Sequence, residues 1–67
     1  MPNDVKAPDV TVELTGHDGN AFSIMGRVSK ALIAAGLPDL ARQYLVDAQT
    51  GDYDHLLQVT MQYVNVE

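Results

Sequence analysis

Residues 20–35, NAFSIMGRVSKALIAA, have the start signal, the stop signal and the apolar spacing of a single helix. Asn20 is a good N-cap, because its side-chain oxygen can accept a hydrogen bond from a free backbone N–H of the first turn. Gly36 suits the left-handed position that follows a helix, and Pro38 cannot continue one. We therefore predict a helix over residues 20–35, against which the other elements must pack.

This predicted helix is apolar on more than one side. Successive helical residues lie about 100° apart, and the apolar arc is wider than the ~100° that one-sided packing needs. The width predicts either two packing partners within the chain or a second flank that contacts another subunit. One flank contains Ala21, Ile24, Met25, Val28, Leu32 and Ala35. The second flank, which is the predicted interface, contains Phe22, Gly26, Ser29 and Ile33.

Two segments have the pattern of short strands. Residues 10–15 and 62–66 alternate between apolar and polar side chains, as half-buried strands do. We predict that they pair, with parallel and antiparallel orientations both open. Residues 1–9 contain two prolines and few apolar side chains, and are predicted to be a flexible tail before a single domain over residues 10–67. The inward-facing strand residues are predicted to be Val10, Val12, Leu14, Val64 and Val66.

Two further helices are predicted between the strands, over residues 38–49 and 52–61. Pro38 suits a first-turn position, and Asp52 can cap the third helix. The fold class is therefore α+β, in the order β-α-α-α-β. The first of these two helices is predicted to bury Leu40, Ala41, Tyr44, Leu45 and Ala48. The second is predicted to bury Tyr53, Leu56, Leu57, Thr60 and Met61.

The small size of the chain favours self-association. At 67 residues, folding buries only ~60% of the surface of the unfolded chain, and without cysteine there is no disulfide or thiolate metal site to reinforce it. A two-stranded sheet also has two open edges. We expect a homo-oligomer, with a dimer favoured, through either an edge strand or the Phe22 flank. The alternative is a monomer in which the three helices cover one side of the strands.

The net charge of −5 argues against double-stranded nucleic acid as a partner, because binding to phosphates requires clustered Lys and Arg. Most acids have a structural explanation, since Asp18, Asp39, Asp52 and Asp54 fall near predicted helix starts. No apolar run approaches the ~20 residues of a membrane span, and the N-terminus has no signal-peptide pattern. We expect a cytoplasmic protein that does not contact a membrane.

The polar turn before residues 20–35 is a candidate anion site, since a glycine-containing turn at a helix start can present free N–H groups. Its glycine spacing matches no nucleotide-binding fingerprint, and Asp18 would repel phosphate unless Arg27 and Lys30 offset it. An ordinary Asp-Gly tight turn is the alternative. Together with the turn before the third helix, the candidate ligand-binding residues are Gly16, His17, Asp18, Gly19, Asn20, Arg27, Asp52, Asp54 and His55.

The sequence has no strong metal or catalytic signature. The two histidines each lie beside an aspartate, and adjacent helical residues do not converge on one ion. Asp52 and His55, three apart, are better placed as ligands, but capping already accounts for Asp52. Ser23 and Ser29 are not in a nucleophile elbow. We expect no metal, no cofactor and no enzymatic activity.

The segments GHDGNAFSIMGRVSKAL and TGDYDHLLQVTMQYVNVE carry a resemblance, of which DGNAF at residues 18–22 and GDYDHLL at residues 51–57 are the specific parts. Over residues 10–67 the chain resembles a group of small proteins encoded by bacteriophages, prophages and plasmids. The resemblance implies a mobile-element origin and a bacterial host cell, and assigns no activity to particular residues. Both specific parts are predicted helix entrances, which would lie together if the entrances share one end of the domain.

Three functional hypotheses follow. The first is a non-enzymatic binding protein that sterically inhibits a host defence or regulatory protein. The second is an oligomer that binds or sequesters a small, nucleotide-like ligand between subunits. The third is an accessory structural component without a ligand. The partner, the ligand and the number of subunits stay open.

Overall fold

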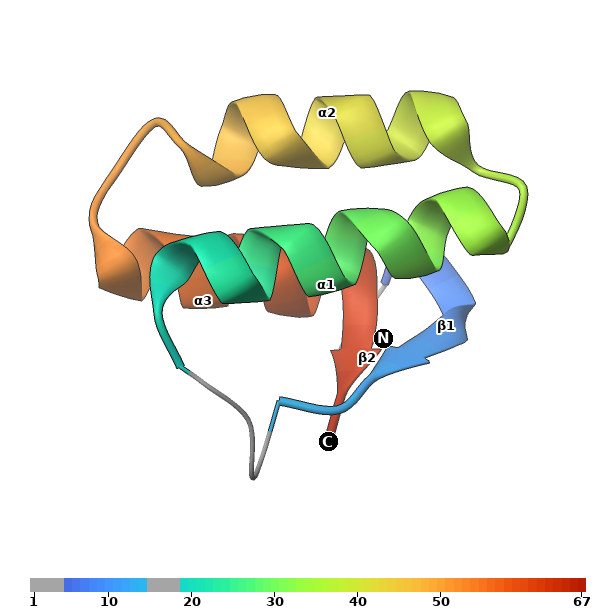
Figure 1. The fold of residues 1–67 in the computed structure, drawn as a ribbon, viewed down its shortest axis with the longest axis horizontal. Coiled ribbons are helices and arrows are strands. Elements are labelled where there is room, and N and C mark those ends of the chain that lie inside the picture. The colour runs from blue at the N-terminus through green and yellow to red at the C-terminus, as the bar shows by residue number, and fades with distance from the viewer. Residues whose placement is uncertain (1–4, 15–18) are drawn as a thin grey trace.

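Three helices lie between two short strands along the chain (Figure 1). The computed structural model describes residues 5–14 and 19–67. The elements are β1 (Ala7–Val12), α1 (Ala21–Ala34), α2 (Pro38–Ala48), α3 (Tyr53–Tyr63) and β2 (Val64–Val66). This arrangement confirms the α+β fold in the order β-α-α-α-β.

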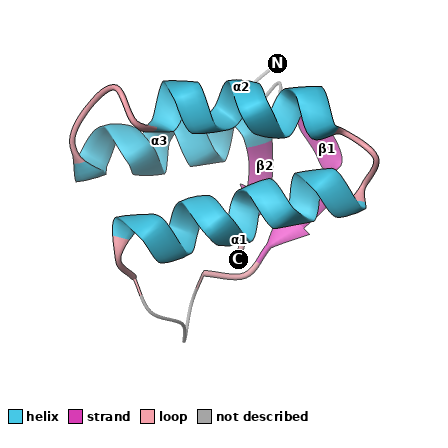
Figure 2. Ribbon diagram, turned by 45° about the horizontal axis from the view of Figure 1, so that its top comes forward, coloured by secondary structure: helices cyan, strands magenta, loops and turns pink. Residues whose placement is uncertain are grey.

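The strands β1 and β2 pair in parallel, which settles their orientation. Parallel strands need a long crossover connection, and here the three helices form it, so that the first and last elements lie side by side (Figure 2). Thr11 lies opposite Asn65, and the register is irregular between Ala7 and Thr11. In this irregular part, the Asn65 side-chain amide donates to the carbonyl oxygen of Pro8 at 2.7 Å.

The first strand begins earlier than its alternating pattern indicated. It starts at Ala7 rather than Val10, and Ala7 is only 3% exposed. Residues 7–9 are therefore part of the fold, and their prediction as flexible tail is wrong. Pro8 obscured the strand in the sequence, but an edge strand tolerates proline because one side of its backbone needs no partner. Residues 1–4 lie outside the described part of the chain.

Both predicted N-caps are confirmed. The Asn20 Oδ1 atom accepts a hydrogen bond from the backbone N–H of Ser23 at 2.8 Å. The Asp52 Oδ1 atom accepts in the same way from the backbone N–H of His55 at 2.9 Å. Each bond satisfies a first-turn donor that would otherwise have no partner in the helix.

The end of α1 is a left-handed glycine cap. Gly36 has a φ of 81°, a conformation that side chains disfavour. Its N–H donates to the carbonyl of Ile33, and the N–H of Leu37 donates to the carbonyl of Leu32, each at 2.9 Å. These two bonds form the Schellman motif, which ends α1 and lets Pro38 start α2, antiparallel to α1 (Figure 1).

The buried side chains agree with the sequence for α1 and α2, and on α3 they agree for Leu56 and Thr60 only. Ile24, Val28 and Leu32 are buried on α1, and Ala41, Tyr44 and Ala48 are buried on α2. On α3 the buried residues are Leu56, Val59, Thr60 and Tyr63, whereas the predicted Tyr53 and Met61 are 45% and 55% exposed. The helix continues to Tyr63, and Val59 and Tyr63 take the places of Tyr53 and Met61 in its buried face. Val66, predicted inward, is also exposed.

A polar network crosses the core between α2 and α3. The hydroxyl of Thr60 donates to the carbonyl of Leu56 at 2.8 Å, so the Tyr44 hydroxyl, 2.8 Å from Thr60 Oγ1, must be the donor in that second bond. The Tyr63 hydroxyl donates to Asp47 Oδ2 at 2.5 Å. Each of these buried hydroxyls has a partner, which removes most of the cost of burying it.

Candidate functional site

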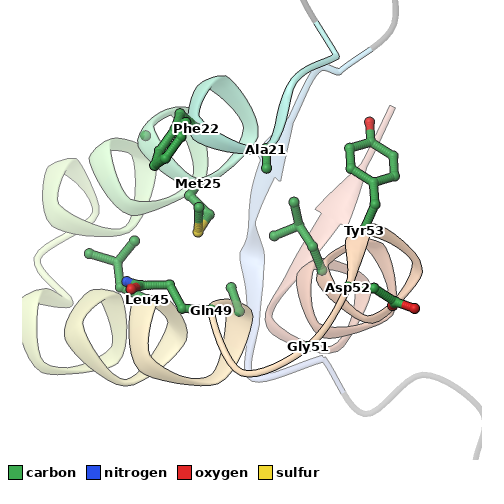
Figure 3. A pocket seen from close by; sticks show the side chains of 11 residues that line it. Ala21, Phe22, Met25, Leu45, Gln49, Gly51, Asp52 and Tyr53 are labelled. Atoms are coloured by element: carbon green, nitrogen blue, oxygen red, sulfur yellow. The ribbon is translucent and has the colours of Figure 1, made fainter.

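An apolar groove lies where the starts of α1 and α3 meet the end of α2. It has a volume of about 550 Å³. Figure 3 shows Phe22 and Met25 on α1, Leu45 and Gln49 on α2, and Tyr53 on α3 around this space. Its lining residues are Ala21, Phe22, Met25, Gly26, Leu45, Ala48, Gln49, Gly51, Asp52, Tyr53 and Leu56.

The entrances of α1 and α3 meet beside this groove. The hydroxyl of Tyr53 donates a hydrogen bond to the carbonyl oxygen of Gly19, the residue before the N-cap of α1. This contact joins the described parts of the two specific segments, residues 19–22 and 51–57. Gly16, His17 and Asp18 lie outside the described residues.

The groove does not have the electrostatics of a phosphate site. Asp52 lines it, whereas Arg27 belongs to a separate hollow on the other flank of α1. No lysine or arginine is among the groove residues. The structure therefore brings Gly19 to Tyr53, the neighbour of Asp52 in the chain, whereas Arg27 lines the other hollow. Asp54 is exposed in the first turn of α3 and does not line the groove.

His55 closes the end of α2 instead of facing the groove. Its Nε2 atom lies 3.0 Å from the carbonyl oxygen of Asp47 and 3.1 Å from Thr50 Oγ1. The Thr50 hydroxyl donates to the same carbonyl at 2.7 Å. These contacts satisfy the Asp47 carbonyl at the end of α2. Within residues 5–14 and 19–67, no three His, Asp or Glu side chains are grouped as metal ligands would be.

A second surface, on the solvent side of α1, contains most of the predicted interface. Phe22 is 85% exposed and Ile33 is 58% exposed. Gly26 is exposed as well, whereas Ser29 is half-buried and donates to the carbonyl of Gly26 at 3.2 Å. We call this surface the outer face of α1. It comprises Phe22, Ser23, Gly26, Arg27, Lys30 and Ile33.

The tyrosines behind the groove are structural. Burial raises the pKa of Tyr63 to about 12, and its hydrogen bond to Asp47 and the charge of that carboxylate act in the same direction. Burial also raises the pKa of Tyr44. Lys6 Nζ lies 5.5 Å from the centroid of the Tyr63 ring, as in a cation–π contact.

Several groove residues were not singled out by the sequence as a site. Met25 and Leu45 were predicted only as core residues, and both are half-buried at the groove. Gln49 had no predicted role. Their shared location depends on how α1 packs against α2. The spacing of residues within one helix does not predict how that helix packs against another.

Comparison of the chain with protein-family models, curated proteins and solved structures finds no match. Among the helices of the described residues, none is long and apolar enough to cross a membrane.

Proposed function

We propose that this chain is a non-enzymatic binding protein of a bacteriophage or another mobile element, and that it acts on a bacterial host protein. A defence or regulatory factor that it inhibits sterically is the partner class we favour. The observation that carries the proposal is the 85% exposure of Phe22 on α1. Aromatic side chains supply much of the binding energy of protein interfaces when a partner buries them.

The position of Phe22 supports this role. The side chain belongs to both the apolar groove and the outer face of α1, so a partner on either surface would contact it. The helix that bears it is capped at both ends, by Asn20 and by the Gly36 motif. An anchor on a capped helix is ordered before binding, which lowers the entropy that binding must offset.

The resemblance to mobile-element proteins supports the host-directed part of the proposal. The described parts of its two specific segments meet through the Tyr53–Gly19 hydrogen bond, next to Phe22 in the groove. The recognisable residues and the exposed anchor are thus at one end of the domain.

Site-specific photocrosslinking tests the proposal. A benzophenone amino acid replaces Phe22 in the chain expressed in bacterial cells, and the matched control carries it at Val46, an exposed apolar residue of α2 outside both surfaces. We expect a discrete crosslinked host protein from position 22 that is missing from position 46. Identical crosslinks from both positions, or none from position 22, would contradict the proposal.

A small-ligand binding function is the second candidate, and the groove favours it. Its volume of about 550 Å³ lies within the ~300–1,000 Å³ of small-molecule sites. A ligand without negative charge fits better than a nucleotide, because Asp52 lines the groove and no lysine or arginine does. Native mass spectrometry of the protein purified from its host should then find a bound small mass. That ligand should raise the melting temperature with concentration.

Self-association belongs to the same proposal, with a dimer favoured. The open edges of the two-stranded sheet offer one route, and the flank with Phe22 and Ile33 offers the other. Light scattering coupled to size exclusion measures the mass in solution. If the α1 flank forms the dimer, Phe22→Asp and Ile33→Asp should yield monomers. An oligomer unchanged in both variants would instead implicate the sheet edge.

A further inference from the structure

The outer face of α1 concentrates positive charge on an acidic chain. The protein has four basic residues and a net charge of −5, and two of the four, Arg27 and Lys30, lie on this face. The other two have partners, since Arg42 pairs with Asp39 at 3.9 Å and Lys6 lies over the Tyr63 ring. No ion pair involving Arg27 or Lys30 occurs among residues 5–14 and 19–67. The face is therefore complementary to an acidic partner.

The same face has an apolar side and a basic side, with Gly26 between them. At about 100° per residue, Phe22 and Ile33 fall roughly 20–40° to one side of Gly26. Lys30 and Arg27 fall roughly 40–100° to the other side. Phe22 and Ile33 are about 16 Å apart along the axis. An amphipathic partner could place apolar and acidic side chains on the two sides at once.

Gly26 leaves room for a close approach. A Cβ atom at this position would meet no other atom within 4 Å, so packing inside the described chain does not require glycine there. Glycine weakens a helix interior compared with alanine, and a small residue at a helix crossing lets two backbones come near. The distance between Phe22 and Ile33 along the axis exceeds the ~10 Å diameter of a helix, so a partner helix can cross α1 between them.

We propose that the outer face of α1 binds an acidic amphipathic helix of its protein partner. The inference rests on the proposed protein-binding function. The partner helix crosses near Gly26, its apolar side chains contact Phe22 and Ile33, and its carboxylates face Arg27 and Lys30. This is the helix-on-groove mode of recognition. The outer face of a second copy fits less well, because it contains Arg27 and Lys30 but no carboxylate to pair with them.

Two designed helical peptides test the inference against the full chain. They share one apolar stripe, and glutamate flanks it in one peptide whereas lysine flanks it in the other. We expect the glutamate peptide to shift the amide NMR signals of residues 22–34, with affinity that falls as salt rises. Arg27→Glu and Lys30→Glu should each weaken binding roughly two- to five-fold. Arg42→Glu, with the same charge change on α2, should not.

A further variant tests whether the partner helix approaches α1 closely at Gly26. Gly26→Gln introduces a good helix-forming residue whose side chain fills the crossing point. We expect it to weaken the glutamate peptide at least as much as either charge reversal, while circular dichroism reports an unchanged helix content. Unaltered affinity in Gly26→Gln would overturn the proposed crossing at this residue.

Other outcomes overturn the inference as a whole. These are equal or tighter binding of the lysine peptide, signal shifts outside residues 22–34, and no binding of either peptide at millimolar concentration. Shifts of the same amides by a nucleoside monophosphate would indicate a small-anion site, and shifts with protein concentration alone would indicate a second copy. A host protein crosslinked at position 22 would leave the binding function standing in each case. Failure of that crosslink is the separate result that counts against the function.

Discussion

The hydroxyl of Tyr53 donates a hydrogen bond to the backbone carbonyl of Gly19 and thereby ties the start of α3 to the start of α1. The two residues are 34 positions apart in the chain. Close to this contact, Asn20 caps α1 and Asp52 caps α3. The groove and Phe22 lie beside the same junction, so its order bears on both proposed binding surfaces.

Tyr53→Phe should loosen the start of α1 while leaving the domain folded. The variant keeps the ring and removes only the hydroxyl, which lies on an exposed side chain, so we expect a loss of about 0.5–1 kcal/mol in the free energy of unfolding. Hydrogen exchange should accelerate at the first amides of α1 and remain unchanged in the middle of α2. Equal exchange rates in variant and parent would show that the bond does not order this junction.

The Tyr44–Thr60 pair should behave as one unit in a double-mutant cycle. Thr60→Val leaves the buried Tyr44 hydroxyl without its acceptor, which costs about 1–3 kcal/mol. Tyr44→Phe should cost less, because the Thr60 hydroxyl keeps its bond to the Leu56 carbonyl. Urea unfolding of the double variant should give less destabilisation than the sum of the single changes. Strict additivity would mean that the two hydroxyls are not coupled.

Alkaline pH should destabilise the protein through Tyr63. Its pKa is about 12 in the folded protein, above the ordinary value near 10, so the unfolded chain loses this proton first. The stabilising contribution is complete below about pH 10 and is lost as the pH rises toward 12. Between about pH 10 and 12, a tyrosine with this shift lowers the free energy of unfolding by about 1.4 kcal/mol per pH unit. Tyr44, whose pKa is also raised, contributes in the same direction.

Urea unfolding at several alkaline pH values measures this dependence, and the tyrosinate ultraviolet spectrum follows the ionisation. Tyr63→Phe should be less stable near neutral pH, because Asp47 loses its partner, and its stability should fall less steeply above pH 10. A slope as steep as that of the parent would assign the alkaline loss to other groups.

Local signals in the sequence predicted the helices better than the sheet. Asn20, Gly36 and Asp52 act on backbone groups within a few residues, so their roles can be inferred without the rest of the fold. The strand start at Ala7 depends instead on pairing with Val64, at the other end of the chain. No local pattern indicates such a contact.

The candidate site was harder to predict for the same reason. The groove combines Met25 and Leu45, which belong to different helices and come together only by packing. The buried face of α3 was predicted only in part, because Tyr63 was assigned to the strand and its helical spacing from Val59 was missed. The helical period alone predicts that Phe22 and Ile33 share a second flank. Their exposure could not be predicted, because the same period also allowed a packing partner within the chain.

Two glycines should respond in opposite directions to the same change to alanine. At Gly51, a Cβ atom would lie 2.7 Å from both Cβ and Cγ of His55, so the turn or the histidine must shift. We expect Gly51→Ala to lower the free energy of unfolding by about 1–3 kcal/mol. At Gly26 a Cβ atom would meet nothing within 4 Å, and Gly26→Ala should raise it by about 0.5–1 kcal/mol.

Thermal and urea unfolding of the two variants measure the contrast, and each variant is the control for the other. A shift of the same sign in both would mean that contact with His55 does not decide the effect at Gly51. If Gly26→Ala both stabilises the domain and weakens binding of the glutamate peptide, the glycine lowers stability but permits contact with a partner. Stabilisation without any loss of binding would leave Gly26 without a role at the outer face of α1.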